Sequence, residues 1–204
     1  TIVAGCGIHC GTADDSQHDG IHSFFIGKNA KVKYVEKHYG SGDGSGERIM
    51  NPQTIMEIGE DSYMEMDTAQ IKGVDSTIRN TTAKLAKGAG LKVTERLMTH
   101  GKQTAKSMFH VEMNGEDSST NLISRSVAKD DSYQLFESNI NGNAKCSGHS
   151  ECDAIIVGNA KVSSVPGITA NNSDAALIHE AAIGKIAGEQ IIKLMTLGLT
   201  EEEA

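Results

Sequence analysis

The chain is poor in the residues that build bulky cores and rigid turns. It has no Trp, 4 Phe, 4 Tyr and 2 Pro among its 204 residues. No apolar run approaches the roughly 20 residues needed to span a bilayer, and no charged and then apolar leader opens the chain. These absences argue against a membrane or exported protein, and we expect a cytoplasmic one.

Basic clusters are also absent. The formal net charge is −8, and the sequence holds no run of Lys and Arg and no set of aromatic residues suited to base stacking. Contacts between basic side chains and phosphate supply most of the affinity in nucleic-acid binding. Nucleic acid and anionic membranes are therefore not expected as partners.

The chain has only four cysteines, in two pairs: Cys6 with Cys10, and Cys146 with Cys152. In a reducing compartment, an even cysteine count indicates metal or redox chemistry more often than disulfides. The second pair flanks His149, and thiolate and imidazole are ligands of iron, copper and zinc. No second ligand pair at zinc-finger spacing accompanies this group, so an alternative is that both thiols are small hydrophobic core residues.

His179 and Glu180 follow in an apolar segment that is predicted to be helical. Adjacent helix residues point about 100° apart, so the two side chains would face different surroundings. From the residues alone, a lone His-Glu pair is more typical of a solvated surface than of a site.

Residues 21–165 consist of short alternating runs rich in Val, Ile and Thr, separated by turns of Gly, Asn, Asp and Ser. This pattern predicts many short strands, in a sandwich, a barrel or a stacked coil. A small corner motif recurs in Lys28-Asn-Ala-Lys-Val32, Lys87-Gly-Ala-Gly-Leu91 and Gly158-Asn-Ala-Lys-Val162, which favours the coil. Residues 1–20 lack periodicity and are predicted to be irregular.

The end of the chain is predicted to be helical. Asn172-Ser-Asp174 is a candidate N-cap for a helix over 175–183, a second amphipathic segment covers 186–197, and Thr200 would cap a third helix. The apolar residues here are too many for one side of a lone helix, so they form either core or a docking surface. The predicted partner-binding residues are Ile183, Ile186, Ile191, Leu194, Met195 and Leu197.

With these residues in view, the chain resembles the core of the SufB/SufD family of iron-sulfur cluster assembly proteins, and SufB more than SufD. It looks like a short archaeal-type member or a core fragment. The resemblance is most specific over residues 146–204. It rests on the segments Glu151-Cys152-Asp153-Ala-Ile-Ile, Val165-Pro-Gly, Ala176-Leu-Ile-His-Glu-Ala-Ala-Ile-Gly-Lys-Ile, Gly188-Glu-Gln and Leu197-Gly-Leu-Thr-Glu-Glu-Glu-Ala.

The resemblance implies a right-handed parallel β-helix over residues 1–170, with a C-terminal helical segment over 171–204 that docks a SufC-like ABC ATPase. It implies a scaffold rather than an enzyme, paired with a second copy or a SufD-like paralogue. Cys152 would receive sulfur, and His179 with Glu180 would ligate iron at the dimer interface. The cluster, [4Fe-4S] or [2Fe-2S], would be bound transiently.

Candidate auxiliary ligands complete the set, and the resemblance assigns no role to them: Cys146, His149, Glu151, Cys6 and Cys10. Two alternatives stay open. One is a SufD-like subunit that stabilises the complex without holding a cluster. The other is a polysaccharide-active β-helix enzyme, which would need a ladder of carboxylate or basic residues that the sequence does not show.

Overall fold

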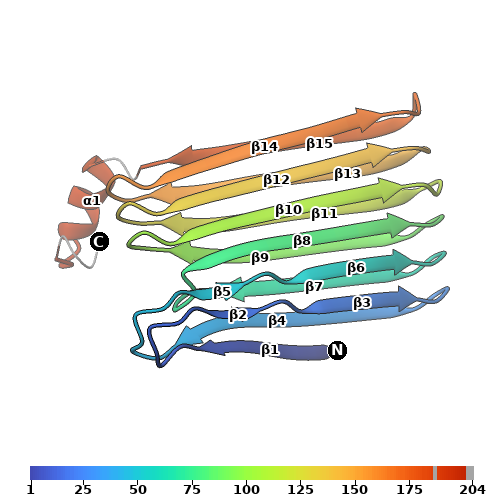
Figure 1. The fold of residues 1–204 in the computed structure, drawn as a ribbon. Helices are drawn as coiled ribbons and strands as arrows, with labels where there is room; N and C mark the ends of the chain where they lie inside the picture. The colour runs from blue at the N-terminus through green and yellow to red at the C-terminus, as the bar shows by residue number, and fades with distance from the viewer. Residues whose placement is uncertain (186–187, 201–204) are drawn as a thin grey trace.

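The alternating runs become parallel strands in the computed structural model of the chain, which describes residues 1–185 and 188–200. Each strand pairs with a strand roughly 30 residues along the chain, a period typical of repeat architectures. The chain therefore winds as a parallel β-solenoid of about six turns (Figure 1). This confirms that the β-helix is parallel, as predicted.

Two sheets line the solenoid. The seven-stranded sheet comprises β1 (Ile2–His9), β4 (Lys31–Ser41), β7 (Tyr63–Gln70), β9 (Gly90–Thr99), β11 (Ser118–Ala128), β13 (Cys146–Ile156) and β15 (Ala175–Gly184). The eight-stranded sheet comprises β2 (Ser16–His18), β3 (Ile21–Ile26), β5 (Arg48–Met50), β6 (Gln53–Ile58), β8 (Ser76–Leu85), β10 (Thr104–Met113), β12 (Tyr133–Gly142) and β14 (Lys161–Ala170).

The recurring small-residue motif marks corners of the coil. Asn29, Asp61, Gly88 and Asp117 all have positive φ, and the amide of each donates a hydrogen bond to a carbonyl in the next turn. Asn, Asp and Gly tolerate this left-handed conformation better than other residues do. Corners of one geometry thus stack, and they hold successive turns in register.

The interior has an apolar and a polar half. Side chains near the stacked corners form one hydrophobic cluster that includes Met64, Met66, Leu91, Leu122 and Ile140. Farther along the same strands the inward positions become polar and even charged. The large buried polar side chains there are Glu36, His38, Gln70, Arg79, Glu95 and Gln134.

The helix predicted over 175–183 is wrong, because these residues form β15. Asn172 does act as a local cap, since its Oδ1 accepts a hydrogen bond from the amide of Asp174. That contact closes the turn between β14 and β15 rather than starting a helix, as Asn side chains do in turns. Pairing along the whole of β13 then overrides the helix propensity of the alanines.

The prediction that residues 1–20 are irregular is also wrong, because β1 and β2 form there. At the other end, the segment predicted to be helical over 186–197 contains one short helix, α1 (Gly188–Met195). The helix predicted from Thr200 falls mostly on residues 201–204, and Ile186 likewise lies outside the described residues.

Candidate functional site

Two of the three predicted cluster ligands lie on the inner side of the last turns. Cys152, on β13, points into the solenoid and is 1% exposed. His179, on β15, pairs in register with buried Ser150, so it shares that inner side two positions away from Cys152. His179 is nonetheless exposed, since no described strand lies beyond β15 in its sheet.

Glu180 lies on the outer side of β15. It pairs in register with Glu151, and its Oε2 is 3.6 Å from Nε2 of His149. One donor atom each of His149, Glu151 and Glu180 lie within 4.8 Å of one another. Within one chain, Glu180 therefore lies on the outer face beside the predicted auxiliary ligands His149 and Glu151, and not beside Cys152.

The Cys152 thiol is held in its protonated form. Burial raises its pKa, the charges of Glu95 and Asp153 raise it further, and a hydrogen bond with Ser164 opposes them. The thiolate is the form that attacks sulfur donors and binds metal. Reaction at Cys152 therefore requires a change that exposes or deprotonates it.

The other cysteines are not near this group. Cys146 is buried in the hydrophobic cluster to which Cys152 also belongs, and it lies at the start of β13, next to the stacked corners. Cys6 and Cys10 lie in the first turn, at the opposite end of the stack from β15 (Figure 1). Within one chain, Cys6 and Cys10 cannot join Cys152 at one metal.

A line of inward polar residues connects these two ends, and the sequence analysis missed it. Register pairs place Glu36, Thr68, Glu95, Ser124 and Cys152 one above another. The Ser124 hydroxyl donates to Glu95 Oε2 at 2.9 Å. The alternating pattern of the sequence could have revealed this line, because its charged residues fall at the same alternate strand positions as the buried apolar residues.

Most of the predicted partner-binding residues lie on α1 or beside it. Ile191, Leu194 and Met195 lie on α1, and Leu197 follows it, 77% exposed. Ile183 lies on the exposed end of β15. Among the described residues, α1 packs extensively against no strand, and none of the described helices is long and apolar enough to cross a membrane.

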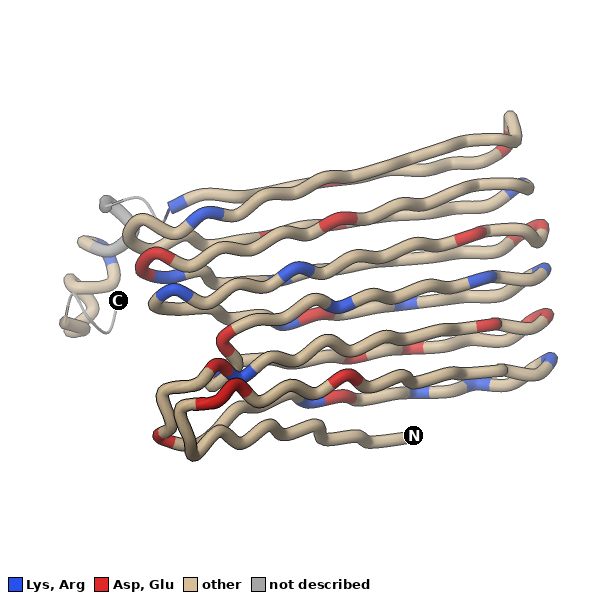
Figure 2. The backbone as a smooth tube through the Cα atoms, viewed as in Figure 1, with Lys and Arg blue, Asp and Glu red and all other residues tan. Residues whose placement is uncertain are grey.

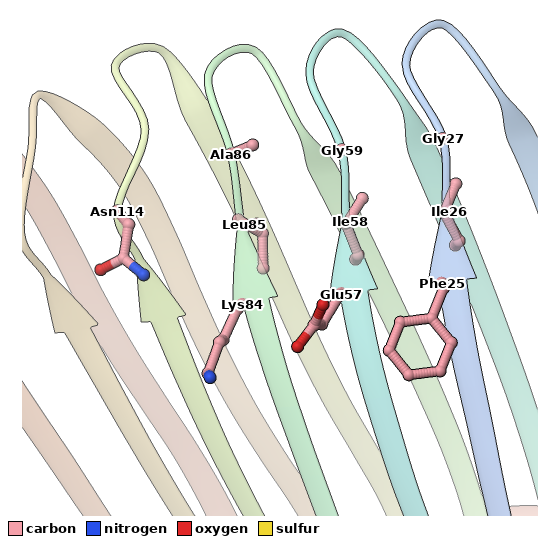
Figure 3. Close-up of a pocket in the computed structure, with 10 residues that line it drawn as sticks. All are labelled: Phe25, Ile26, Gly27, Glu57, Ile58, Gly59, Lys84, Leu85, Ala86 and Asn114. Atoms are coloured by element: carbon pink, nitrogen blue, oxygen red, sulfur yellow. The ribbon is translucent and has the colours of Figure 1, made fainter.

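A shallow groove of about 530 Å³ lies on the outer face of the eight-stranded sheet (Figure 3). Phe25, Glu57 and Lys84 project from neighbouring strands along it. Glu57 is its single carboxylate, whereas glycoside hydrolysis generally uses a pair. The groove therefore does not support the polysaccharide-active alternative.

The fold and these residues define a β-solenoid with candidate thiol, imidazole and carboxylate ligands at one end. The family model described as "SUF system FeS cluster assembly, SufBD core domain" matches residues 1–204. The chain belongs to this family.

Archaeal relatives agree with that assignment. An iron-sulfur cluster assembly SufBD family protein of Methanocaldococcus jannaschii is 35% identical over 181 residues, which is 88% of this chain and 57% of the relative. A protein of the same name from Archaeoglobus fulgidus is 30% identical over 205 residues, 100% of this chain and 54% of the relative. The chain thus spans little more than half of these relatives, whose names do not distinguish SufB from SufD.

Proposed function

We propose that this chain is a scaffold without catalytic turnover of its own, which receives sulfur and iron and holds a nascent iron-sulfur cluster as cargo. Cys152, His179 and Glu180 are its proposed ligands. The observation that carries the proposal is the last turn of the solenoid, where an imidazole on an exposed strand lies on the same inner side as a thiol.

The ligand types suit a cluster that must be released, of either the [2Fe-2S] or the [4Fe-4S] type. Thiolate is the usual ligand of iron in clusters, whereas imidazole and carboxylate replace it less often. A site with one thiolate and weaker partners binds iron without the persistence of an all-cysteine site.

A second molecule is needed to complete the site, since Glu180 lies on the opposite side of its strand from His179. Each of β14 and β15 has one edge that no described strand covers, and such edges pair readily with other strands. Ile178 on β15 is 58% exposed and Val165 on β14 is 51% exposed. We infer that a second copy, or a SufD-like paralogue, binds here.

Access to Cys152 then requires movement of the last turn. The apolar surface around α1 is the proposed docking site of a SufC-like ABC ATPase, whose nucleotide cycle would drive that movement. Only residues 185–187 separate α1 from β15 in the sequence, so a partner bound at the helix would act close to the strand that carries His179 and Glu180.

One observation favours the second candidate, a SufD-like subunit that holds no cluster. Cys152 is more deeply buried than a sulfur acceptor needs to be, and its pKa is raised by burial. The two candidates differ in whether Cys152 binds iron.

Anaerobic reconstitution with Fe³⁺, sulfide and a thiol reductant, alone and with the candidate ATPase, separates them. Iron and sulfide are counted in the wild type and in the variants Cys152→Ser, His179→Ala and Glu180→Gln. Cys146→Ser is the matched control, since Cys146 lies on the same strand and faces the apolar core. We expect the three site variants to lose cluster absorption and the control to keep it.

An equal cluster content in Cys152→Ser and the wild type would refute the assignment of Cys152. A wild type that binds the ATPase but never holds iron and sulfide would support the SufD-like role instead.

A further inference from the structure

The first two turns of the solenoid contain a second group of soft-metal ligands, far along the stack from Cys152. Cys6 on β1 pairs in register with His38 on β4, and Ala4 pairs with Glu36, so all three functional side chains are inward neighbours. One donor atom from each of Cys6, Glu36 and His38 lies within 4.8 Å of the other two. Glu36 and His38 are fully enclosed at the side-chain level.

His38 offers an unused ligand atom. Its Nε2 is buried and has no hydrogen-bond partner, although Glu36 Oε1 lies 3.2 Å away in unsuitable geometry. A buried polar atom without a partner costs about 1–3 kcal/mol and needs an explanation. An ion bound between Cys6, Glu36 and His38 would satisfy this nitrogen.

The charge of the interior also leaves room for a cation. Two carboxyl side chains, Glu36 and Glu95, share one guanidinium, that of Arg79, which is 2.8 Å from Glu36 and 3.8 Å from Glu95. If both carboxyls are ionised, one negative charge is uncompensated. A divalent ion bound with a deprotonated Cys6 supplies one net positive charge and leaves the group neutral.

We propose that Cys6, Glu36 and His38 bind a divalent transition-metal ion of the zinc and iron(II) class. Thiolate together with imidazole selects such ions over Mg²⁺ or Ca²⁺, which prefer oxygen ligands. His22 is an outer partner of the site, because its Nδ1 lies 3.0 Å from Glu36 Oε1 and 2.6 Å from the hydroxyl of Tyr34. The His22 side chain is 31% exposed, so it also marks a route from solvent.

Binding requires a defined rearrangement of hydrogens. Arg79 Nη2 lies 2.9 Å from Nδ1 of His38 and donates to it, which leaves the ring hydrogen on Nε2. On metal binding the hydrogen moves to Nδ1, the metal takes Nε2, and Arg79 turns toward Glu95. Cys6 gives its proton to solvent. The site is independent of the proposed cluster ligands, since none of its members is Cys152, His179 or Glu180.

The test uses anaerobic titration with Co²⁺, which reports thiolate coordination through a charge-transfer band. Cys152→Ser is the background, so that the proposed cluster ligand does not contribute. Cys6→Ser, His38→Gln and His22→Ala are added singly. Cys10→Ser is the matched control, because Cys10 lies in the same turn with Sγ 3.3 Å from the carbonyl oxygen of Asp14.

We expect the band in the background and in the Cys10→Ser variant, and its loss in Cys6→Ser. His22→Ala should weaken binding by about 10- to 100-fold, and His38→Gln by more, as loss of a direct ligand exceeds loss of an outer partner. A band that persists in Cys6→Ser, or that is absent from the folded background, would overturn the proposal.

A second measurement does not depend on variants. Zn²⁺ should slow the alkylation of Cys6 in the wild type, followed by mass spectrometry, and should leave the rates at Cys10 and Cys146 unchanged. Equal alkylation of Cys6 with and without Zn²⁺ would contradict the site even if a variant misfolds.

Discussion

The second turn of the solenoid, which is covered on both sides, encloses its inward polar side chains, whereas the last turn exposes them. Glu36 contacts Arg79, His38 and Tyr34 at full burial. His179 occupies an inward position too, but solvent reaches it. The last turn also has few charged residues along its strands, as Figure 2 shows.

The difference follows from how a solenoid is stabilised. Each turn contacts only its neighbours, so an inward polar group in the middle must find partners inside the molecule. A polar group in a terminal turn keeps its bonding capacity for another molecule. The same strand position is thus a structural element in one region and a candidate ligand in the other.

The largest expected effect tests the buried ionisable side chains Glu36, His38, Arg79 and Glu95, which we call the enclosed network. Arg79→Met removes the one guanidinium that Glu36 and Glu95 share, and leaves two buried carboxyl groups without a cation. Removing one partner of a buried ion pair typically costs about 3–5 kcal/mol. Denaturant unfolding, in the presence of a chelator, measures the loss.

Arg125→Met is the matched control on the outer face. Its side chain is 62% exposed and pairs with Glu151, so the expected cost is below about 1 kcal/mol. Equal costs for the two variants would mean that water reaches the interior, and the contrast between the regions would fail.

A smaller effect compares apolar packing in the two regions. Leu122, on β11, is 1% exposed, and Leu177, on β15, packs against the same hydrophobic cluster but is only partly buried. Leu122→Ala should cost about 3 kcal/mol through lost transfer energy and a cavity. Leu177→Ala should cost about 1–2 kcal/mol, because part of its surface is never removed from water.

Protein concentration sharpens this comparison. A second copy over β14 and β15 would bury Leu177 further. The free energy of unfolding lost in Leu177→Ala should therefore be larger when it is measured at concentrations where a dimer forms. A cost that is equal to that of Leu122→Ala in the monomer would contradict the exposed last turn.

The sequence predicted the fold better than it predicted its two ends. The corner motif at Asn29 and Gly88 indicated a coil because those turns need left-handed residues, and the resemblance selected the parallel β-helix. β1 was missed because Gly5 and Gly7 weaken a strand pattern. In the structure, the exposed Tyr39 ring lies over Gly7, so a side chain at position 7 would have to displace that ring.

The candidate sites show the same limit. Cys152, His179 and Glu180 were found through resemblance, but only strand register shows that Glu180 is on the outer side. Cys6 was noted as a ligand by residue type alone. Its neighbours Glu36 and His38 are about 30 residues away in sequence, the length of one solenoid turn, so no local pattern joins them.

The last prediction concerns the pH dependence of the enclosed network. The groups facing His38 are Cys6, Glu36, Gln70 and Arg79. Burial lowers the pKa of His38, the contact with Glu36 opposes this, and the charge of Arg79 lowers it further. The unfolded chain therefore takes up a proton near the ordinary His pKa of about 6.5 while the folded state does not. Stability should then fall as the pH drops below that value.

Denaturant unfolding with a chelator at pH 7, 6 and 5 tests this, with His38→Gln as the comparison. An amide does not titrate, so the variant should show a flatter dependence over this range. A wild type that gains stability on acidification would mean that the folded state binds the proton more tightly than the unfolded chain. His38 would then be an imidazolium paired with Glu36, its Nε2 hydrogen would have a partner, and the group of Cys6, Glu36 and His38 would have less need of a metal ion.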